Sequence, residues 1–163
     1  MRIVGVCGSL QAASSNLTLL REMAELVPDG TTFEICDLVR DLPLFDPDIE
    51  THGAAPEAVA TWRSTVGGAH ALIITSPEYG HSLPGALKNA IDWVIGTGEF
   101  NEKVVGVTAS TNAPGRGQRG LIALTRTLAA VNATIVGGEP IVRDDHHRDT
   151  LQRFVADVVE RAS

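Results

Sequence analysis

The sequence contains few of the residues that mark disulfide-stapled, metal-binding or membrane-spanning proteins. Its two cysteines, Cys7 and Cys36, form no Cys-x-x-Cys pair, so we expect buried, reduced thiols rather than a redox motif. The adjacent His146 and His147 have no third metal ligand at a suitable spacing, which predicts a solvated loop. No apolar run reaches the roughly 18 residues of a membrane span. Met1 begins no signal-peptide pattern, so we expect a cytoplasmic protein with no membrane partner.

Positive charge is also scarce. Lysine and arginine total 13 against 20 aspartate and glutamate residues, a formal net charge of −7. Clustered basic residues supply most of the affinity for nucleic acid, so this balance disfavours a nucleic-acid partner. An anionic small ligand would be held locally, by backbone amides and hydroxyl groups. With 44% hydrophobic residues, the chain suits one substantial core, and we expect residues 1–163 to form a single domain.

Five short apolar segments alternate with helical patterns along the chain. The expected strands are residues 3–7, 31–36, 70–75, 103–108 and 133–136. Helical patterns follow each of them, and residues 37–48, which include two prolines, are expected to form a long loop. This alternation predicts an α/β fold, a three-layer sandwich around a five-stranded parallel sheet in the order 2-1-3-4-5. Ligands bind such sheets beyond the carboxyl ends of strands 1 and 3.

The loop after the first expected strand, Gly8 to Asn16, combines small residues, hydroxyls and a carboxamide just before a helix. A helix N-terminus has free backbone N–H groups and a partial positive charge, so this loop suits a phosphate. It lacks both the nucleoside-triphosphate P-loop spacing and the dinucleotide fingerprint, which favours one terminal phosphate. The alternative is ordinary N-capping by Ser14 or Ser15.

A second polar loop, Pro77 to Ser82, follows the third expected strand and leads into a helix containing Leu-Lys-Asn-Ala-Ile-Asp-Trp. Because Pro77 and Pro84 bound this loop, its backbone amides and carbonyls are expected to be fixed toward the edge of a flat ring. Gly80 permits a positive φ at little cost. The alternative is a plain strand-to-helix connection with Ser82 near the helix cap.

Together, the two loops resemble those of the NAD(P)H-dependent FMN reductase family, a flavodoxin-like group that includes quinone, azo-dye and chromate reductases. The family's first loop runs Gly-Ser-x-Arg-x-x-Ser-x-Asn, and its second runs Pro-Glu-Tyr-Asn before a similar helix. This chain has Gln11 in place of the arginine and Gly80 in place of the asparagine. The resemblance implies a flavodoxin-like fold, FMN as cofactor and NADPH or NADH as reductant.

The resemblance also implies which residues hold the flavin. The residues expected to contact the phosphate lie in the first loop and are Ser9, Gln11, Ser14, Ser15 and Asn16. Ring contacts fall to Pro77, Glu78, Tyr79 and Gly80, and a third loop, residues 110–119, closes the pocket with Ser110.

For several other side chains around these loops, the sequence leaves more than one role possible. Phe45 is a candidate wall of the substrate pocket, and Trp93 packs either in a subunit interface or at the edge of the core. Arg116 is either a contact for a nicotinamide-cofactor phosphate or an exposed loop residue. Glu78 and His81 are the pocket candidates for proton transfer, and an exposed position is the alternative for His81.

The implied function is that of a homodimeric or homotetrameric FMN-dependent NAD(P)H oxidoreductase. Hydride would pass from nicotinamide to flavin and on to a small-molecule acceptor such as free flavin or a quinone, without a catalytic side chain. A flavodoxin-like electron carrier that oxidises no NAD(P)H is one alternative. Another is a degenerate member in which Gln11 and Gly80 mark a loss of flavin binding.

Overall fold

A computed structural model describes residues 1–52 and 54–163 of the chain. Five parallel strands form a sheet in the order β2-β1-β3-β4-β5, which confirms the predicted topology. The strands are β1 (Arg2–Cys7), β2 (Thr32–Cys36), β3 (Ala71–Thr75), β4 (Val104–Thr111) and β5 (Thr134–Val142). Their starts are in register, since Ala71 pairs with both Ile3 and Val104. All carboxyl ends therefore lie at one edge of the sheet.

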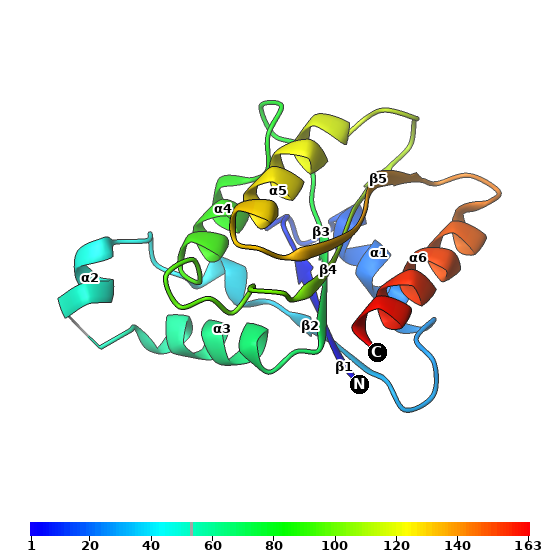
Figure 1. The fold of residues 1–163 in the computed structure, drawn as a ribbon. Helices are drawn as coiled ribbons and strands as arrows, with labels where there is room; N and C mark the ends of the chain where they lie inside the picture. Colours follow the sequence, from blue (N-terminus) through cyan, green and yellow to red (C-terminus); the bar gives the residue numbers. More distant parts are fainter. Residues whose placement is uncertain (53) are drawn as a thin grey trace.

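Helices cover both faces of the sheet (Figure 1). One face carries α1 (Ser15–Ala24) and α6 (His147–Ala162), and the other carries α3 (Glu57–Gly67), α4 (Gly85–Asp92) and α5 (Gln118–Ala130). Strand side chains alternate between the two layers, so Val4 shares one buried cluster with Trp62 while Ile3 shares the other with Phe154. The predicted three-layer sandwich is confirmed.

Residues 37–48 do not form the continuous loop that was predicted. A short 3-10 helix, η1 (Leu38–Arg40), follows β2, and α2 (Pro47–His52) begins at the second proline. Proline suits a first helical turn because the N–H that it lacks would have no partner there. The two prolines led to the prediction of a loop, but the second of them, Pro47, begins a helix.

Trp93 is fully buried within its own chain. Its indole Nε1 donates a 2.7 Å hydrogen bond to the carbonyl of Pro43, and its ring meets that of Phe45 edge-on with centroids 5.1 Å apart. Asn89 Nδ2 donates to the same carbonyl at 2.9 Å. These bonds attach the segment before α2 to the end of α4. Trp93 is therefore a core residue, as the second of its two assignments predicted.

The last strand continues well beyond its predicted end at Val136. Gly137 and Gly138 have φ values of +80° and +106°, and the pairing of β5 with β4 shifts register beside them. This β-bulge allows an edge strand to continue through Pro140, whose missing N–H would disrupt a central strand. The longer β5 brings Arg143 to the carboxyl edge, where its backbone N–H donates to the Thr111 carbonyl at 2.9 Å.

The structure also places the cysteines and the histidine pair that the sequence singled out. Cys7 is buried, Cys36 is half-buried, and both are free thiols. The described residues contain no cluster of three or more histidine, cysteine or acidic side chains placed to hold a metal. Within the same residues, no helix is long and apolar enough to cross a membrane. The prediction of a solvated loop is wrong for His147, because it begins α6 and its Nε2 lies 2.8 Å from Glu22 Oε2 on α1.

Candidate functional site

A pocket of about 550 Å³ lies at the carboxyl edge of the sheet, where the loops after β1, β3 and β4 converge. The predicted cofactor residues in its wall are Ser15, Asn16, Pro77, Glu78 and Ser110. The third loop supplies much of the remainder, including Asn112, Arg116 and Arg119. The other predicted residues belong to the first two loops but lie outside the pocket wall: Ser9, Gln11, Ser14, Tyr79 and Gly80.

The first loop leaves the N-terminus of α1 open. The first helical hydrogen bond runs from the Thr18 N–H to the Ser14 carbonyl at 3.1 Å, so the N–H groups of residues 15–17 precede the helical ladder. Ser14 is the N-cap, but its side chain makes no capping bond; its hydroxyl is buried 3.9 Å from Cys7 Sγ. Ordinary side-chain capping therefore does not occur here. The exposed Ser15 and the free N–H groups fit an anion.

Asn16 holds the start of α1 against the sheet. Its side chain is buried, and its Oδ1 accepts a 2.9 Å hydrogen bond from the Ser110 N–H at the end of β4. Its carbonyl accepts a 3.0 Å bond from the Thr75 hydroxyl on β3. One residue thus ties the first loop to two neighbouring strands. Asn16 therefore positions the pocket wall, and its side-chain amide oxygen is occupied by the hydrogen bond from Ser110.

The second loop is closed by its own hydrogen bonds. Tyr79 and Ser82 exchange two backbone bonds of 3.0 Å, and the residues between them, Gly80 and His81, have φ values of +57° and +63°. Positive φ at both central positions is typical of a type I′ turn. Glycine adopts this conformation freely, whereas His81 is strained. Pro84 is the N-cap of α4, so Ser82 does not cap that helix.

Glu78 binds the N-terminus of α5. Its Oε2 accepts hydrogen bonds from the backbone N–H groups of Arg119 at 3.0 Å and Gly120 at 3.1 Å. The bond from Gly120 is the main cause that lowers the pKa of Glu78 from its ordinary value of 4.5, with His81 and Arg119 adding to it. Glu78 is therefore held as a carboxylate and is a poor proton donor near neutral pH.

His81 lies between Glu78 and Arg119 at the tip of the second loop. Its Nδ1 is 3.2 Å from Glu78 Oε1 and 2.8 Å from Arg119 Nη1. One ring nitrogen cannot donate to the carboxylate and accept from the guanidinium in the same protonation state. The side chain is 68% exposed, which confirms the exposed assignment.

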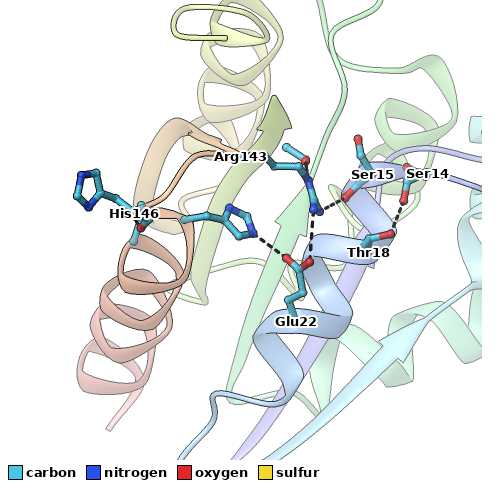
Figure 2. A network of polar contacts seen from close by, with 9 residues as sticks. Ser14, Ser15, Thr18, Glu22, Arg143 and His146 are labelled. Atoms are coloured by element: carbon cyan, nitrogen blue, oxygen red, sulfur yellow. Dashed lines mark hydrogen bonds and ion pairs between the residues drawn. The ribbon is translucent and has the colours of Figure 1, made fainter. Parts of the chain in front are cut away.

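Arg143 reaches the first loop from the end of β5 (Figure 2). Its Nε donates to the Ser110 hydroxyl at 2.9 Å, and its Nη2 lies 3.5 Å from the Ser15 carbonyl. Its Nη1 is 3.4 Å from Glu22 Oε1. Sequence reasoning missed Arg143 because the expected fifth strand ended too early. The available signal was a lone arginine following the last apolar run, which only the full strand places at the ligand edge.

The pocket and its loops fit the phosphate and flat ring of a flavin mononucleotide. Ser15 and Asn16, whose N–H groups precede the helical ladder, line the pocket together with Pro77 and Glu78, which lead into the closed turn of the second loop. Gly120 permits this arrangement, because a Cβ there would come within 3.0 Å of Glu78 and force the second loop away from α5.

Comparison with known sequences gives several relatives of assigned activity, of which two are described. An NAD(P)H-dependent FMN reductase from Pseudomonas aeruginosa is 40% identical over 93 residues, which cover 57% of this chain and 49% of that protein. A quinone reductase from Escherichia coli K12 is 32% identical over 94 residues, covering 58% and 50%. The chain thus spans about half the length of the curated relatives that it matches.

Solved structures share the fold over nearly the whole chain. FerB, a flavoenzyme NAD(P)H:(acceptor) oxidoreductase from Paracoccus denitrificans, superposes with a TM-score of 0.86 at 24% identity, covering 99% of this chain and 96% of that one. Flavodoxin 1 from Bacillus cereus superposes with a TM-score of 0.67 at 15% identity, covering 98% of each chain. The flavodoxin-like fold is therefore confirmed.

Residues 1–147 match the NADPH-dependent FMN reductase family, and this stretch includes all five strands and all three loops of the pocket. The chain belongs to the NADPH-dependent FMN reductase family.

Proposed function

We propose that this protein binds FMN noncovalently and uses NADPH or NADH to reduce a small-molecule acceptor of the quinone type. The observation that carries the proposal is the open N-terminus of α1 beside a pocket at the β1/β3 switch point, in a chain of this family. The names of the Pseudomonas and Escherichia coli relatives supply the reductant and the acceptor class.

The first loop is proposed to bind the phosphate. The N–H groups of residues 15–17 and the hydroxyls of Ser9 and Ser15 are the donors. Ser14 would contribute through its backbone, since its hydroxyl is turned toward Cys7. Asn16 would position these donors through its bond to Ser110. Gln11, which is exposed, would contribute at most a neutral contact where the family has an arginine.

The second and third loops are proposed to orient the ring. Backbone groups of residues 78–80 would meet the ring edge, and their closed turn limits the ordering needed on binding. Tyr79, 54% exposed, is available for aromatic contact, and Pro77 and Ser110 form the wall. When FMN is bound, hydride transfer and electron delivery are the chemistry of its ring.

The charged residues of the pocket would then have distinct tasks. Arg116 and Arg119 line the wall and would attract the phosphates of NADPH or NADH. Glu78 would hold the second loop against α5 as a carboxylate and would not transfer a proton. From the family membership we expect a homodimer or homotetramer in the cytoplasm, and the exposed Leu44 and Phe45 would be available for a subunit contact.

Titration of the purified apoprotein with FMN tests the proposal. We expect quenching of flavin fluorescence, followed by oxidation of NADPH or NADH that depends on both FMN and an added benzoquinone. Heat-unfolded protein is the control for flavin released into solution. No detectable FMN binding at high micromolar protein would contradict the proposal and favour a degenerate family member. FMN binding without any oxidation of NADPH or NADH would indicate the electron carrier instead.

A further inference from the structure

We propose that Arg143 supplies the positive charge of the FMN phosphate site that Gln11 does not. This inference rests on the proposed FMN binding and assigns one residue within it. A phosphate at the N-terminus of α1 carries up to two negative charges in a protein whose net charge is −7. A nearby guanidinium strengthens such a contact well beyond what neutral donors provide.

The position of Arg143 supports this role. Its three side-chain nitrogens contact three groups around the first loop: the Ser110 hydroxyl, the Ser15 carbonyl and the Glu22 carboxylate. Ser15 and Ser110 both line the pocket, and the guanidinium contacts both of them. Figure 2 shows the side chain between the end of β5 and the first turn of α1.

Glu22 holds the guanidinium in this place. Its carboxylate is shared between Arg143, 3.4 Å from Nη1, and His147, 2.8 Å from Nε2. All three side chains are largely shielded, with exposed fractions of 30% for Arg143, 34% for Glu22 and 17% for His147. An arginine anchored by a carboxylate at one nitrogen and a hydroxyl at another loses little freedom when a phosphate arrives.

Arg40 is the rival candidate. It approaches the opposite end of the first loop from η1, with Nη2 3.2 Å from the Leu10 carbonyl, next to Gln11. However, its side chain is 46% exposed and also pairs with Asp37 at 3.5 Å. Neither Arg40 nor Leu10 lines the pocket. Arg143 is favoured because it contacts two residues that do.

Paired titrations with FMN and riboflavin test the assignment, because riboflavin has the same ring without the phosphate. The variants of the 163-residue chain are Arg143→Gln, Arg40→Gln and, as a control for charge, Arg148→Gln at an exposed position on α6. We expect Arg143→Gln to weaken FMN binding about tenfold while riboflavin binding changes less than about twofold. The other two variants should change both affinities less than about threefold.

A rescue experiment separates charge from structure. Adding Gln11→Arg to Arg143→Gln should restore most of the lost FMN affinity, and Arg143→Lys should retain more of it than Arg143→Gln. Equal weakening of FMN and riboflavin in Arg143→Gln would assign a merely structural role and overturn the inference. So would an unchanged FMN affinity, or a larger FMN-specific loss in Arg40→Gln. If the wild-type protein binds neither flavin, the proposed function fails together with the inference. If the wild type binds FMN but the Arg143 variants do not behave as expected, only the inference about Arg143 fails.

Discussion

The two loops that begin the pocket, residues 8–16 after β1 and residues 77–84 after β3, occupy equivalent places in the fold but are built differently. The second loop is closed by its own Tyr79–Ser82 bond pair, and Glu78 then fixes the closed loop to α5. The first loop leaves the helical N–H groups of residues 15–17 ahead of the ladder and is held from outside, by Ser110, Arg40 and Arg143.

This difference indicates that the two loops suit different parts of a ligand. A loop with satisfied hydrogen bonds keeps its shape without a ligand, which suits the edge of a flat ring. A loop with free donors gains its last bonds from the ligand, which suits a phosphate. Stability should therefore respond most to changes that affect the second loop or the attachment of the first, whereas affinity should respond to charge at the first.

Asn16→Ala should have the largest effect on stability. The substitution removes the buried Asn16 side chain and leaves the half-buried Ser110 N–H without its partner, so we expect the free energy of unfolding to fall by about 2 kcal/mol. Urea denaturation of the apoprotein measures this loss, and FMN titration should show weaker binding because the loop is no longer fixed to β4. Gln11→Ala, at an exposed position in the same loop, is the control and should leave stability unchanged. Equal stability of Asn16→Ala and wild type would show that the first loop is not held from outside.

Ser15→Asp should move stability and affinity in opposite directions. Aspartate at the first position of α1 is favoured by the helix dipole, so the apoprotein should gain about 0.5 kcal/mol. The same charge repels a phosphate, and FMN binding should weaken about tenfold, roughly 1.4 kcal/mol. Thermal melts and fluorescence titration report the two effects separately, with Ser15→Asn as the uncharged control. Unchanged FMN affinity would place the phosphate away from this helix.

Gly80→Ala tests the closed turn of the second loop. Because Gly80 has φ +57° and open space around a Cβ, the cost is conformational alone, and we expect about 1 kcal/mol of lost stability. Gly85→Ala is the matched control. Gly85 also has open space, but it begins α4 without a positive φ, so alanine should be neutral or slightly stabilising there. Equal stabilities of the two variants would argue against a fixed turn.

Glu78→Gln should have the smallest effect at neutral pH and a clear signature in acid. A carboxyl whose folded pKa is lowered contributes stability above its unfolded value, near 4.5, and loses that contribution as pH falls through the folded value. The melting temperature of wild type should therefore fall more steeply than that of Glu78→Gln from about pH 5 downward. The difference between the two curves isolates Glu78 from other carboxyls. Parallel curves would show that the α5 contact adds no stability.

The layers, the strand order and the two pocket loops could all be predicted from the sequence. Strand and helix periods are local, and five alternations leave few arrangements besides a doubly covered parallel sheet. The positions of Gly80, Pro84 and Ser15 also followed from local chemistry, because turn and cap preferences depend on neighbouring residues. The two glycines Gly137 and Gly138 led to a predicted strand end at Val136. The strand instead continues through a β-bulge, which forms only in pairing with the neighbouring strand and so cannot be predicted from local sequence.

The side chains that reach the pocket loops from distant parts of the chain could be identified only from the folded structure. Glu78 binds Arg119, 41 residues away; Asn16 binds Ser110, 94 residues away; and Arg143 approaches Ser15, 128 residues away. Trp93, which the sequence left between interface and core, was decided by the carbonyl of Pro43, 50 residues distant. Such partners become neighbours only when the parallel sheet aligns the carboxyl ends of its strands at one edge. A local sequence pattern cannot predict such contacts, because each one joins two segments that are far apart in the sequence and become neighbours only in the folded protein.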